Sequence, residues 1–395
     1  MSILVINAGS SSLKFGLFDE EARQELATGL IDWKVDPRHA ELVIRPQRGE
    51  PIRSQESIAE HGVAVRYAVR RLSEMAEACG ANAITIVGHR VVHGGARFHT
   101  PVRIDSQVRS ALAKLSELAP LHNPAAVEAI EAAQSALPTV PQVAVFDTAF
   151  FATLAPHAYL YPVPYAWFTD WGIRRFGFHG ISHAYCAGRA AELLGREPVG
   201  LRLVICHLGN GCSASAVRDG RAVQTTMGFT PMEGLMMGTR CGSLDPGVLI
   251  DVQRRRGLSV DQLDRALNQE SGLLAISGIS GDYRQVEAAA VKGEERAGLA
   301  LEMYADRVRA AIGALAVTLG GVDGLVFTAG VGENAAGLRS VVCQGLECLG
   351  LHLDAVRNTG CSPDADIART DSPGRILIMR TREELMIARE ARRVV

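Results

Sequence analysis

Hydrophobic residues along this chain follow two patterns, short continuous runs that indicate buried strands and spacings of three and four that indicate amphipathic helices. Residues 3–18 contain two apolar runs separated by a Gly/Ser turn, which predicts a β-hairpin. Residues 203–217 repeat this order of strand, tight turn and strand. Glycine lets the backbone approach a ligand, and successive N–H groups in such a turn can bind an anion. The repeated hairpin therefore predicts two lobes that grip a polyphosphate from opposite sides.

The remaining pattern alternates helices with short strands. Residues 108–119 carry a helical apolar stripe, for which Asp105 or Ser106 is a suitable N-cap. Residues 295–319 form a longer amphipathic pattern that ends at two glycines, as a helix C-terminus does. This alternation predicts an α/β fold. Short apolar strands are predicted at residues 85–92, 143–146, 324–328 and 375–379.

The length of 395 residues favours two domains. Residues 150–180 are rich in aromatic side chains and proline, so we interpret them as an irregular crossover and place the boundary near residue 150. The predicted N-terminal lobe comprises residues 1–150, joined by a C-terminal helix at 384–395. The predicted C-terminal, nucleotide-binding lobe comprises residues 151–383.

The composition argues against several classes of protein, among them nucleic-acid-binding, zinc-ribbon and membrane-spanning proteins. Hydrophobic residues make up 47% and charged residues 21%, as in an ordinary globular protein, and the net charge of −2 offers no basic field for nucleic acid. The eight cysteines contain no Cys-x-x-Cys pair, which argues against a zinc ribbon or redox motif and fits a reducing cytosol. The apolar stretch at 310–327 is interrupted by glycine and aspartate, and the chain enters a strand at Ile3. We therefore expect a cytoplasmic protein without a membrane span or signal peptide.

The first hairpin turn offers groups that suit phosphate chemistry. Its backbone amides and serine hydroxyls could bind phosphate, Asn7 a metal and Lys14 a phosphate oxygen, although a plain hairpin turn is the alternative. The motif Gly-x-x-x-x-Gly-Lys-Ser/Thr is absent from the sequence, which excludes a P-loop. The turn at 330–334 places glycines where a backbone could pass over a base, or it simply joins a strand to a helix.

Arginines and acids supply further candidates. Arg90 lies at the end of a strand, and Arg240 lies in a glycine-bounded loop without charged neighbours, where its planar fork of donors suits carboxylate or phosphoryl oxygens. Either arginine could instead be a solvated ion-pair partner. Thr381 and Glu384 have the spacing of a capping box, which gives Glu384 a structural role and leaves Glu383 as the better metal-ligand candidate. The alternative is that Glu383 is simply an acid in the first turn, where the helix dipole favours negative charge.

Taken together, these segments resemble the acetate kinase (acetokinase) family along nearly the whole chain. The resemblance implies an α/β fold of the actin-like ATPase and sugar-kinase superfamily, with two lobes that are duplicated ribonuclease H-like domains. The matching stretches are residues 7–14, 89–95, 121–124, 146–150, 175–183, 207–211, 237–242, 282–284, 330–334 and 383–385.

The resemblance also implies the activity: reversible phosphorylation of acetate by ATP, which gives acetyl phosphate and ADP by direct in-line transfer. ATP and ADP would be substrates, and Mg²⁺ would be the metal cofactor, for which Mn²⁺ could substitute. The family forms homodimers, so the resemblance implies a homodimer. Its partners would be the small molecules acetate and ATP, and we expect neither nucleic acid nor a membrane as a partner.

Residue roles follow from the matching motifs, as implications of the resemblance. The catalytic residues would be Asp147, His179, Arg240 and Arg90, with Arg90 binding the carboxylate, His179 and Arg240 stabilising the transition state, and Asp147 as proton donor or acceptor. The metal would be held by Asn7 and Glu383. The substrate methyl group would contact Val92, Leu121, Phe178 and Pro231. The nucleotide would contact Lys14, His207, Leu208, Gly209, Asn210, Gly211, Asp282, Tyr283, Arg284, Gly330, Val331, Gly332, Glu333 and Asn334.

The chemistry of the acceptor limits the role of Asp147. A short carboxylic acid has a pKa of about 4–5, by analogy with Glu, so the nucleophile is already ionised at neutral pH. Phosphoryl transfer then needs positioning and charge neutralisation more than a base. We therefore interpret Asp147 as a residue that orients Arg90 or a metal-bound water.

Two departures and three alternatives remain at this point. Ser243 stands where the family usually has an acid, and Arg382 replaces a usual asparagine, which puts only local ion pairing in doubt. Propionate kinase is the alternative within the class. A sugar or polyol kinase would use Asp147 as a base, and a non-enzymatic nucleotide switch would need a partner-binding segment.

Overall fold

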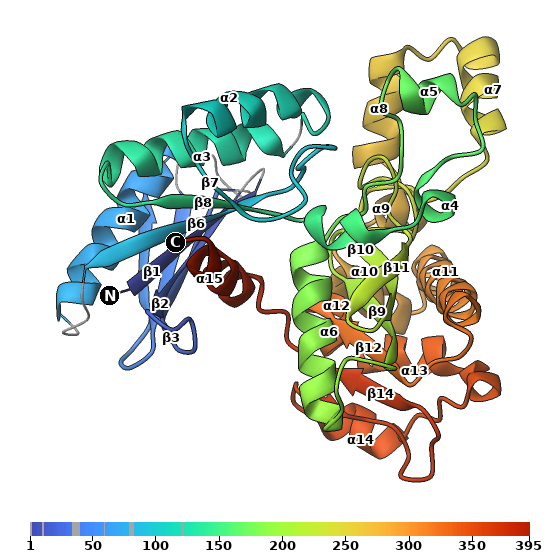
Figure 1. Ribbon diagram of the computed structural model, residues 1–395. Coiled ribbons are helices and arrows are strands. Elements are labelled where there is room, and N and C mark those ends of the chain that lie inside the picture. Colours follow the sequence, from blue (N-terminus) through green and yellow to red (C-terminus); the bar gives the residue numbers. More distant parts are fainter. Residues whose placement is uncertain (1, 10–11, 34–39, 59, 79–82, 121) are drawn as a thin grey trace. The chain divides into compact units, whose positions relative to one another are not determined.

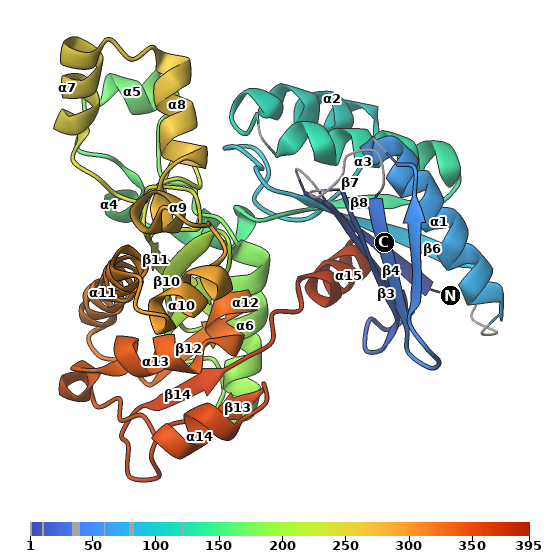
Figure 2. The same ribbon diagram turned by 180° about the vertical axis from the view of Figure 1, so that it is seen from behind.

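The computed structural model describes residues 2–9, 12–33, 40–58, 60–78, 83–120 and 122–395. The chain forms two compact units, drawn in Figures 1 and 2. Unit 1 comprises Met1–Phe150 and Arg382–Val395, and unit 2 comprises Phe151–Thr381. Leu121, which the sequence assigns to the substrate pocket, lies outside the described residues, as do Ser10 and Ser11 of the first turn.

Unit 1 is built on a sheet with the strand order β5-β4-β3-β2-β1-β6-β8-β7. Its strands are β1 (Ser2–Ala8), β2 (Ser12–Asp19), β3 (Glu25–Asp32), β4 (Ala40–Pro46), β5 (Ile52–Glu56), β6 (Ile84–Val91), β7 (Val102–Arg103) and β8 (Gln142–Phe146). Its helices are α1 (His61–Ala78), α2 (Ser106–Lys114), α3 (Asn123–Ala136) and α15 (Glu383–Val394).

Unit 2 is built on a sheet with the order β11-β10-β9-β12-β14-β13. Its strands are β9 (Arg202–Leu208), β10 (Cys212–Arg218), β11 (Arg221–Thr225), β12 (Gly324–Thr328), β13 (Ala365–Asp366) and β14 (Arg375–Ile378). Its helices are α4 (Pro156–Tyr159), α5 (Ala166–Thr169), α6 (Gly180–Leu194), α7 (Pro246–Arg256), α8 (Val260–Gln269), α9 (Gly272–Ser277), α10 (Tyr283–Val291), α11 (Glu295–Leu319), α12 (Ala329–Asn334), α13 (Ala336–Cys343) and α14 (Ala355–Gly360).

The two sheets share one topology. In each, a predicted hairpin, β1–β2 or β9–β10, is antiparallel, and its first strand pairs in parallel with a later strand, β6 or β12. A second parallel strand, β8 or β14, follows on the far side. In this register Asn7 pairs with Lys14 and His207 pairs with Ser213, so Asn7 and His207 occupy equivalent positions. The duplication that the repeated hairpin predicts is therefore present in the fold.

The final helix completes unit 1. Helix α15 packs against β1, β6 and β8. The approach is close because β6 carries Gly88, where a Cβ atom would lie 2.8 Å from Ile387 Cγ2 and 3.2 Å from Ala391 Cβ. The opposite face of the sheet packs on α1 and α3, whose buried side chains include Leu72 and Ala129. Unit 1 therefore draws its core from both ends of the chain.

Several predicted helix boundaries agree with the structure, and others do not. Helix α11 ends at Leu319, where Gly320 adopts φ 70° as the C-cap. The helix predicted at 108–119 is shorter, because α2 gives way to a 3₁₀ turn at Leu115–Glu117, but its N-cap is Asp105, which accepts a hydrogen bond from Val108 N at 2.7 Å. None of the helices in the described parts of the chain is both long and apolar enough for a bilayer crossing.

The predicted capping box at the start of α15 is wrong. The N-cap position is Arg382, and no side chain caps the helix. Glu384 instead accepts a hydrogen bond from Asn7 Nδ2 at 3.2 Å, and Thr381 donates its hydroxyl to Ser182 Oγ at 3.0 Å. Tertiary partners thus outweigh the local motif.

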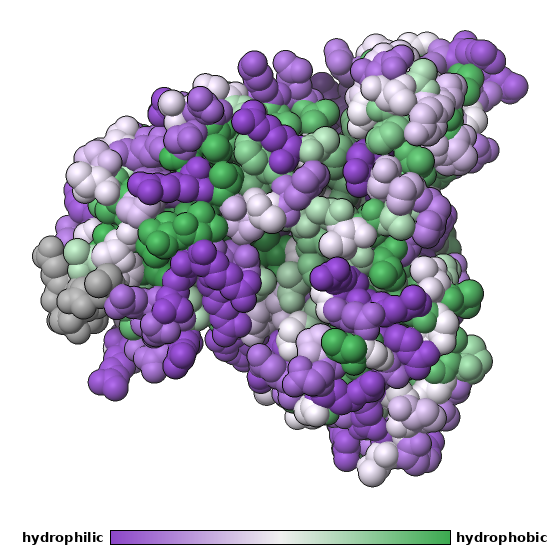
Figure 3. Space-filling model, viewed as in Figure 1, coloured by the Kyte–Doolittle hydropathy of each residue, from purple (hydrophilic) through white to green (hydrophobic). Residues whose placement is uncertain are grey.

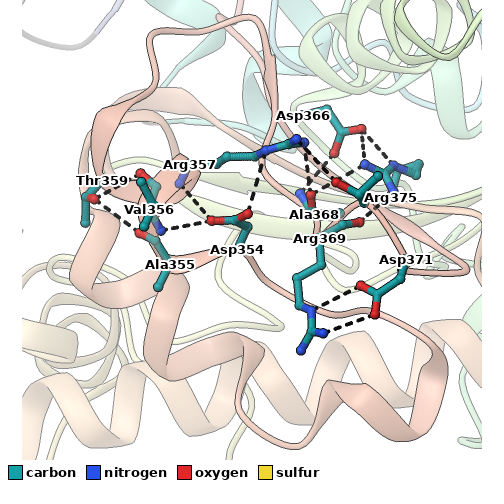
Figure 4. Close-up of polar contacts among 11 residues, drawn as sticks. Asp354, Ala355, Val356, Arg357, Thr359, Asp366, Ala368, Arg369, Asp371 and Arg375 are labelled. Carbon is teal, nitrogen blue, oxygen red and sulfur yellow. Dashed lines mark hydrogen bonds and ion pairs between the residues drawn. The ribbon is translucent and has the colours of Figure 1, made fainter.

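Ionic contacts hold the edge of the sheet in unit 2, as Figure 4 shows. Asp354 caps α14 by accepting from the backbone N–H groups of Val356 and Arg357, at 3.0 Å each. Arg375, the first residue of β14, pairs with Asp366 of β13 at 2.6 Å, and both side chains are partly buried. These contacts keep β13 beside β14, the strand from which the chain leaves unit 2.

His89 makes the stability of unit 1 sensitive to pH. Its side chain is 1% exposed on β6, and its Nε2 shares a hydrogen bond of 2.7 Å with Gln142 Oε1. Burial lowers the pKa of His89 to about 4, although the hydrogen bond to Gln142 opposes this shift. An unfolded histidine has a pKa of about 6.5, so unfolding takes up a proton below that pH. The stabilisation is complete above pH 6.5 and is lost as the pH falls toward 4.

We predict that a His89→Gln variant loses less stability on acidification than the wild type. Glutamine keeps a polar group beside Gln142 but does not titrate, so the wild-type free energy of unfolding should fall by about 2 kcal/mol more between pH 7 and pH 5. Urea unfolding at both pH values, followed by circular dichroism, measures the difference. Equal losses in the two proteins would contradict the prediction.

Candidate active site

Polar side chains of unit 1 gather at the carboxyl ends of its parallel strands. Asn7 lies near the end of β1, Arg90 near the end of β6, and Asp147 directly after β8. Because these three strands are parallel, their carboxyl ends meet at one edge of the sheet. Helix α15 brings Glu383 and Glu384 to this edge in its first turn. We call these five residues the unit 1 cluster.

Arg90 is the centre of the unit 1 cluster. Its Nε lies 3.3 and 3.2 Å from the two carboxylate oxygens of Asp147, and its Nη2 lies 2.5 Å from one of them. Its Nη1 donates to Asn7 Oδ1 at 3.2 Å, while Asn7 Nδ2 donates to Glu384 Oε1. Asp147 is 0% exposed, so this fork fixes the plane of the guanidinium.

The charges of the unit 1 cluster do not cancel. Burial lowers the pKa of Arg90, but the charges of Asp147, Glu383 and Glu384 outweigh it and raise that pKa above its usual value. Three carboxylates around one guanidinium leave an excess of negative charge, and the donor atoms are the oxygens that Mg²⁺ prefers. Within the described residues no group of three or more His, Cys, Asp or Glu side chains is arranged to hold a metal by itself. The set fits a magnesium ion that takes its other ligands from phosphate and water.

Unit 2 presents a second cluster around a glycine turn. His179 adopts φ 58° at the N-terminus of α6, and its ring stacks on that of His207, with 4.1 Å between centroids. Gly211 lies between His179 and Arg240: a Cβ there would be 3.3 Å from His179 Nε2 and 3.4 Å from Arg240 Nη1. We call His179, His207, Gly211 and Arg240 the unit 2 cluster.

Arg240 carries a charge that no carboxylate of the described residues balances. Its Nη1 donates to Pro231 O at 2.9 Å and lies 3.7 Å from Met237 Sδ. Burial lowers the pKa of Arg240, and the nearby Cys212 opposes this shift. A partly buried guanidinium whose hydrogen-bond partners are neutral groups favours an anionic ligand.

The predicted nucleotide segments lie in unit 2 around the same turn, except for Lys14, which is exposed on β2. Gly238 N donates to Asn210 O at 3.0 Å, and a Cβ at Gly281 would lie 3.1 Å from Gly238 O. Asp282 is the N-cap of α10 and pairs with Arg284 at 2.6 Å, while Tyr283 is buried and Leu208 lies at the end of β9.

The segment at 330–334 differs from its prediction as a turn. Its residues, Gly330, Val331, Gly332, Glu333 and Asn334, form the short helix α12 immediately after β12. Asn334 Nδ2 donates to Gly330 O at 2.8 Å, and Glu333 accepts from Thr381 N at 2.9 Å. Side chains thus bond to backbone groups in this segment, and Arg339 Nη1 also donates to Gly332 O and Glu333 O.

The predicted substrate-pocket residues are divided between the units. Val92 is 9% exposed and belongs to unit 1, whereas Phe178, 1% exposed, and the partly buried Pro231 belong to unit 2. Sequence reasoning missed two contributors: Glu384, which binds Asn7, and Ser213, whose Oγ lies 3.0 Å from His179 Nδ1. The alternation of serine with alanine along 212–216 was a signal that polar side chains share one face of β10.

Comparison with known proteins identifies relatives along the whole chain. Residues 2–389 match the model of the acetokinase family. A protein from Cyanothece sp. named acetate kinase is 47% identical over 398 residues, which are 99% of this chain and 97% of the relative. The crystal structure of Porphyromonas gingivalis acetate kinase matches with a TM-score of 0.90 at 39% identity, covering 100% of this chain and 99% of that one. A propionate kinase from Francisella tularensis subsp. tularensis matches with a TM-score of 0.91 at 37% identity, covering 100% of both chains.

The solved relatives confirm the predicted α/β fold, that of the actin-like ATPase and sugar-kinase superfamily. The likeness extends over the full chain rather than one domain, and it agrees with the order of motifs along the sequence. The chain belongs to the acetokinase family.

Proposed function

We propose that this protein is an acetate kinase, which transfers the γ-phosphoryl group of ATP to acetate and reverses the reaction with ADP and acetyl phosphate. The observation that carries the proposal is the match to the acetokinase family over residues 2–389, with relatives named acetate kinase at 47% identity. The chemistry of the two clusters is consistent with this activity, and each supplies a different requirement of phosphoryl transfer.

The unit 2 cluster suits the charge that develops during transfer. The transition state spreads negative charge over three equatorial phosphoryl oxygens. The Arg240 guanidinium, without a carboxylate partner in the described part of the chain, and His179 Nε2 converge at Gly211 and would donate to these oxygens. Because these donors are already fixed, little reorganisation is needed as the charge forms.

The unit 1 cluster suits the acceptor. Arg90 would bind the carboxylate of acetate, and Asp147 would orient Arg90 through the bonds to its Nε and Nη2. Acetate is already ionised, so Asp147 need not remove a proton. A cationic partner lowers the repulsion between the carboxylate and the phosphoryl group, which favours their close approach.

We further propose that Mg²⁺, for which Mn²⁺ could substitute, is held by Asn7 and Glu383. The excess negative charge of the unit 1 cluster supports this proposal. When bound, the ion would neutralise charge on the ATP phosphates. Asn7 and Arg90 share a hydrogen bond, so the metal ligand and the carboxylate-binding residue would be positioned together.

We propose that the nucleotide binds to unit 2, the lobe to which the sequence assigns nucleotide binding. The turn Gly209, Asn210 and Gly211 offers backbone N–H groups to phosphate, with Lys14 of unit 1 as an additional cation. The other segments proposed to contact the nucleotide are His207 and Leu208, Asp282 to Arg284, and Gly330 to Asn334.

A direct test is an acyl-phosphate trap. The purified protein, given MgATP and acetate in the presence of hydroxylamine, should form acetyl hydroxamate, and omission of divalent metal should abolish the product. One methylene in an apolar pocket changes the discrimination between two substrates by about 1–3 kcal/mol, so propionate should also react. Values of kcat/KM for acetate, propionate and butyrate then rank the three acids as substrates. A higher value for propionate would favour propionate kinase. ATP consumption with sugars but no hydroxamate would overturn the proposal.

We predict that Arg240→Ala lowers kcat by roughly 10³–10⁵-fold, the range for an arginine that stabilises a phosphoryl-transfer transition state. Arg218→Ala is the matched control, because Arg218 is exposed and donates to Leu319 O, away from the unit 2 cluster. Steady-state assays at saturating acetate and MgATP measure both variants. The assignment fails if Arg240→Ala stays within about tenfold of the wild type.

We also propose that the enzyme is a homodimer, located in the cytoplasm. Its support is a group of exposed apolar side chains in unit 2, on and near α5, α7 and α8, which Figures 1 and 2 draw beside one another. Tyr165 is 66% exposed and Trp171 65%, and Figure 3 shows apolar residues among hydrophilic ones over this part of unit 2. The other members are Val163, Trp167, Leu244, Val248, Ile250 and Val260.

Light scattering after size exclusion should give the mass of two chains, and Trp171→Asp should shift the population toward monomer, since burying a charge at an apolar interface is unfavourable. Val199→Asp is the control, because Val199 is 80% exposed in the loop before β9 and outside this group. A monomeric wild type, or equal effects of the two substitutions, would contradict the proposal.

A further inference from the structure

A chain of hydrogen bonds leads from the interior of unit 2 to His179. Ser215 Oγ lies 2.7 Å from His183 Nδ1, His183 Nε2 lies 2.7 Å from Ser213 Oγ, and Ser213 Oγ lies 3.0 Å from His179 Nδ1. Ser213, Ser215 and His183 are each 0% exposed. We call Ser215, His183, Ser213 and His179 the relay.

The spacing of the relay residues follows from their secondary structure. Ser213 and Ser215 are two residues apart on β10, so their side chains share one face of the sheet. His179 and His183 are four residues apart, at the N-cap and in the first turn of α6, so their side chains share one face of the helix. Helix and strand thus each contribute two members.

Ser213 couples the proton positions of the two histidines. A hydroxyl has one proton, so Ser213 donates to one imidazole and accepts from the other. If Ser213 donates to His179 Nδ1, then His183 must donate from Nε2, and both neutral rings carry their proton on Nε2. If Ser213 donates to His183 Nε2, then His179 must donate from Nδ1.

Ser215 favours the first of these states. Across the described residues, the hydroxyl of Ser215 has one side-chain hydrogen bond, to His183 Nδ1. The Ser215 hydroxyl can donate to His183 only when Nδ1 of that ring carries no hydrogen. A buried donor without an acceptor is unfavourable, so this state is preferred. His183 is also held neutral, because burial, with the nearby His207, keeps its pKa well below the usual value.

We propose that Ser213, His183 and Ser215 are positioning residues that hold His179 in the tautomer with its proton on Nε2. This nitrogen is the one that faces the Gly211 turn, where a Cβ atom would lie 3.3 Å away. The relay thereby makes His179 a hydrogen-bond donor toward an anion at the turn without requiring it to be charged. The catalytic consequence rests on the proposed function, in which that anion is the transferring phosphoryl group.

The neighbouring histidine supports this assignment. His207 Nδ1 lies 2.8 Å from Ser182 Oγ, which in turn accepts from Thr381 Oγ1 at 3.0 Å. Serine hydroxyls therefore hold Nδ1 of both stacked rings. Two charged imidazoles with centroids 4.1 Å apart would repel each other, whereas two neutral Nε2–H tautomers can stack.

Nitrogen NMR on the wild-type protein tests the tautomer directly. Two-bond ¹H–¹⁵N correlation spectra of ¹⁵N-histidine-labelled protein distinguish a protonated from a bare ring nitrogen, and loss of signals in His179→Gln and His183→Gln assigns the two rings. We expect Nε2 protonated and Nδ1 bare in both His179 and His183 at pH 7. A proton on Nδ1 of His179 in the neutral ring would overturn the proposal, and this result does not depend on activity.

Kinetics of serine variants test the consequence for catalysis. Ser213→Ala should lower kcat roughly 10- to 100-fold and Ser215→Ala less, with KM for ATP and acetate nearly unchanged, because the donor is misaligned rather than removed. Ser372→Ala is the matched control: Ser372 is also buried, but its hydroxyl bonds to backbone groups, those of Gly350, His352 and Gly374, among the described residues. Its kcat should stay near that of the wild type.

The outcomes separate the relay from the proposed function. In the Ser213→Ala variant the His179 spectrum should change to a mixture of tautomers, which loss of stability alone would not produce. An unchanged His179 tautomer, or a kcat of Ser213→Ala equal to that of Ser372→Ala, would refute the relay. Absence of acyl-phosphate formation by the wild type, with Nε2 of His179 still protonated, would instead refute the proposed function and leave the tautomer assignment standing.

Discussion

Parallel pairing of the first hairpin strand with two later strands is the constraint on which the site depends. In unit 1 it places the carboxyl ends of β1, β6 and β8 at one edge, and in unit 2 it does the same for β9, β12 and β14. Side chains far apart in the sequence, such as Asn7, Arg90 and Asp147, meet there without a dedicated loop. Rigid strand ends hold such side chains more accurately than loops do.

The arginines at the two sheet edges have opposite electrostatic environments. Arg90 is surrounded by more carboxylate charge than it can neutralise, whereas Arg240 is surrounded by carbonyl, thioether and thiol groups. The first environment attracts a further cation and the second attracts an anion. A metal ion suits the first cluster and a phosphoryl group suits the second, and phosphoryl transfer requires groups for both.

Local patterns predicted the fold well because the responsible interactions are local. The hairpins, β12 and α11 were visible as apolar runs, helical spacing and a terminal glycine. The capping box at Thr381 failed because both of its members have distant partners, and Asn7, the partner of Glu384, is 377 residues away. The site motifs gave the identities of Arg90 and Arg240, but the hydrogen bonds of Ser213 depend on how α6 meets β10, and no spacing within either element reveals that.

The position of α15 has a consequence for how the protein is made. Domains generally fold as units during synthesis, beginning with the N-terminal one. Unit 1 cannot follow this order to completion, because Ile387 and Ala391, which cover β6 at Gly88, are synthesised after the whole of unit 2. Unit 1 therefore cannot complete its core until unit 2 has been synthesised, and the acidic residues that α15 adds to the unit 1 cluster arrive only then.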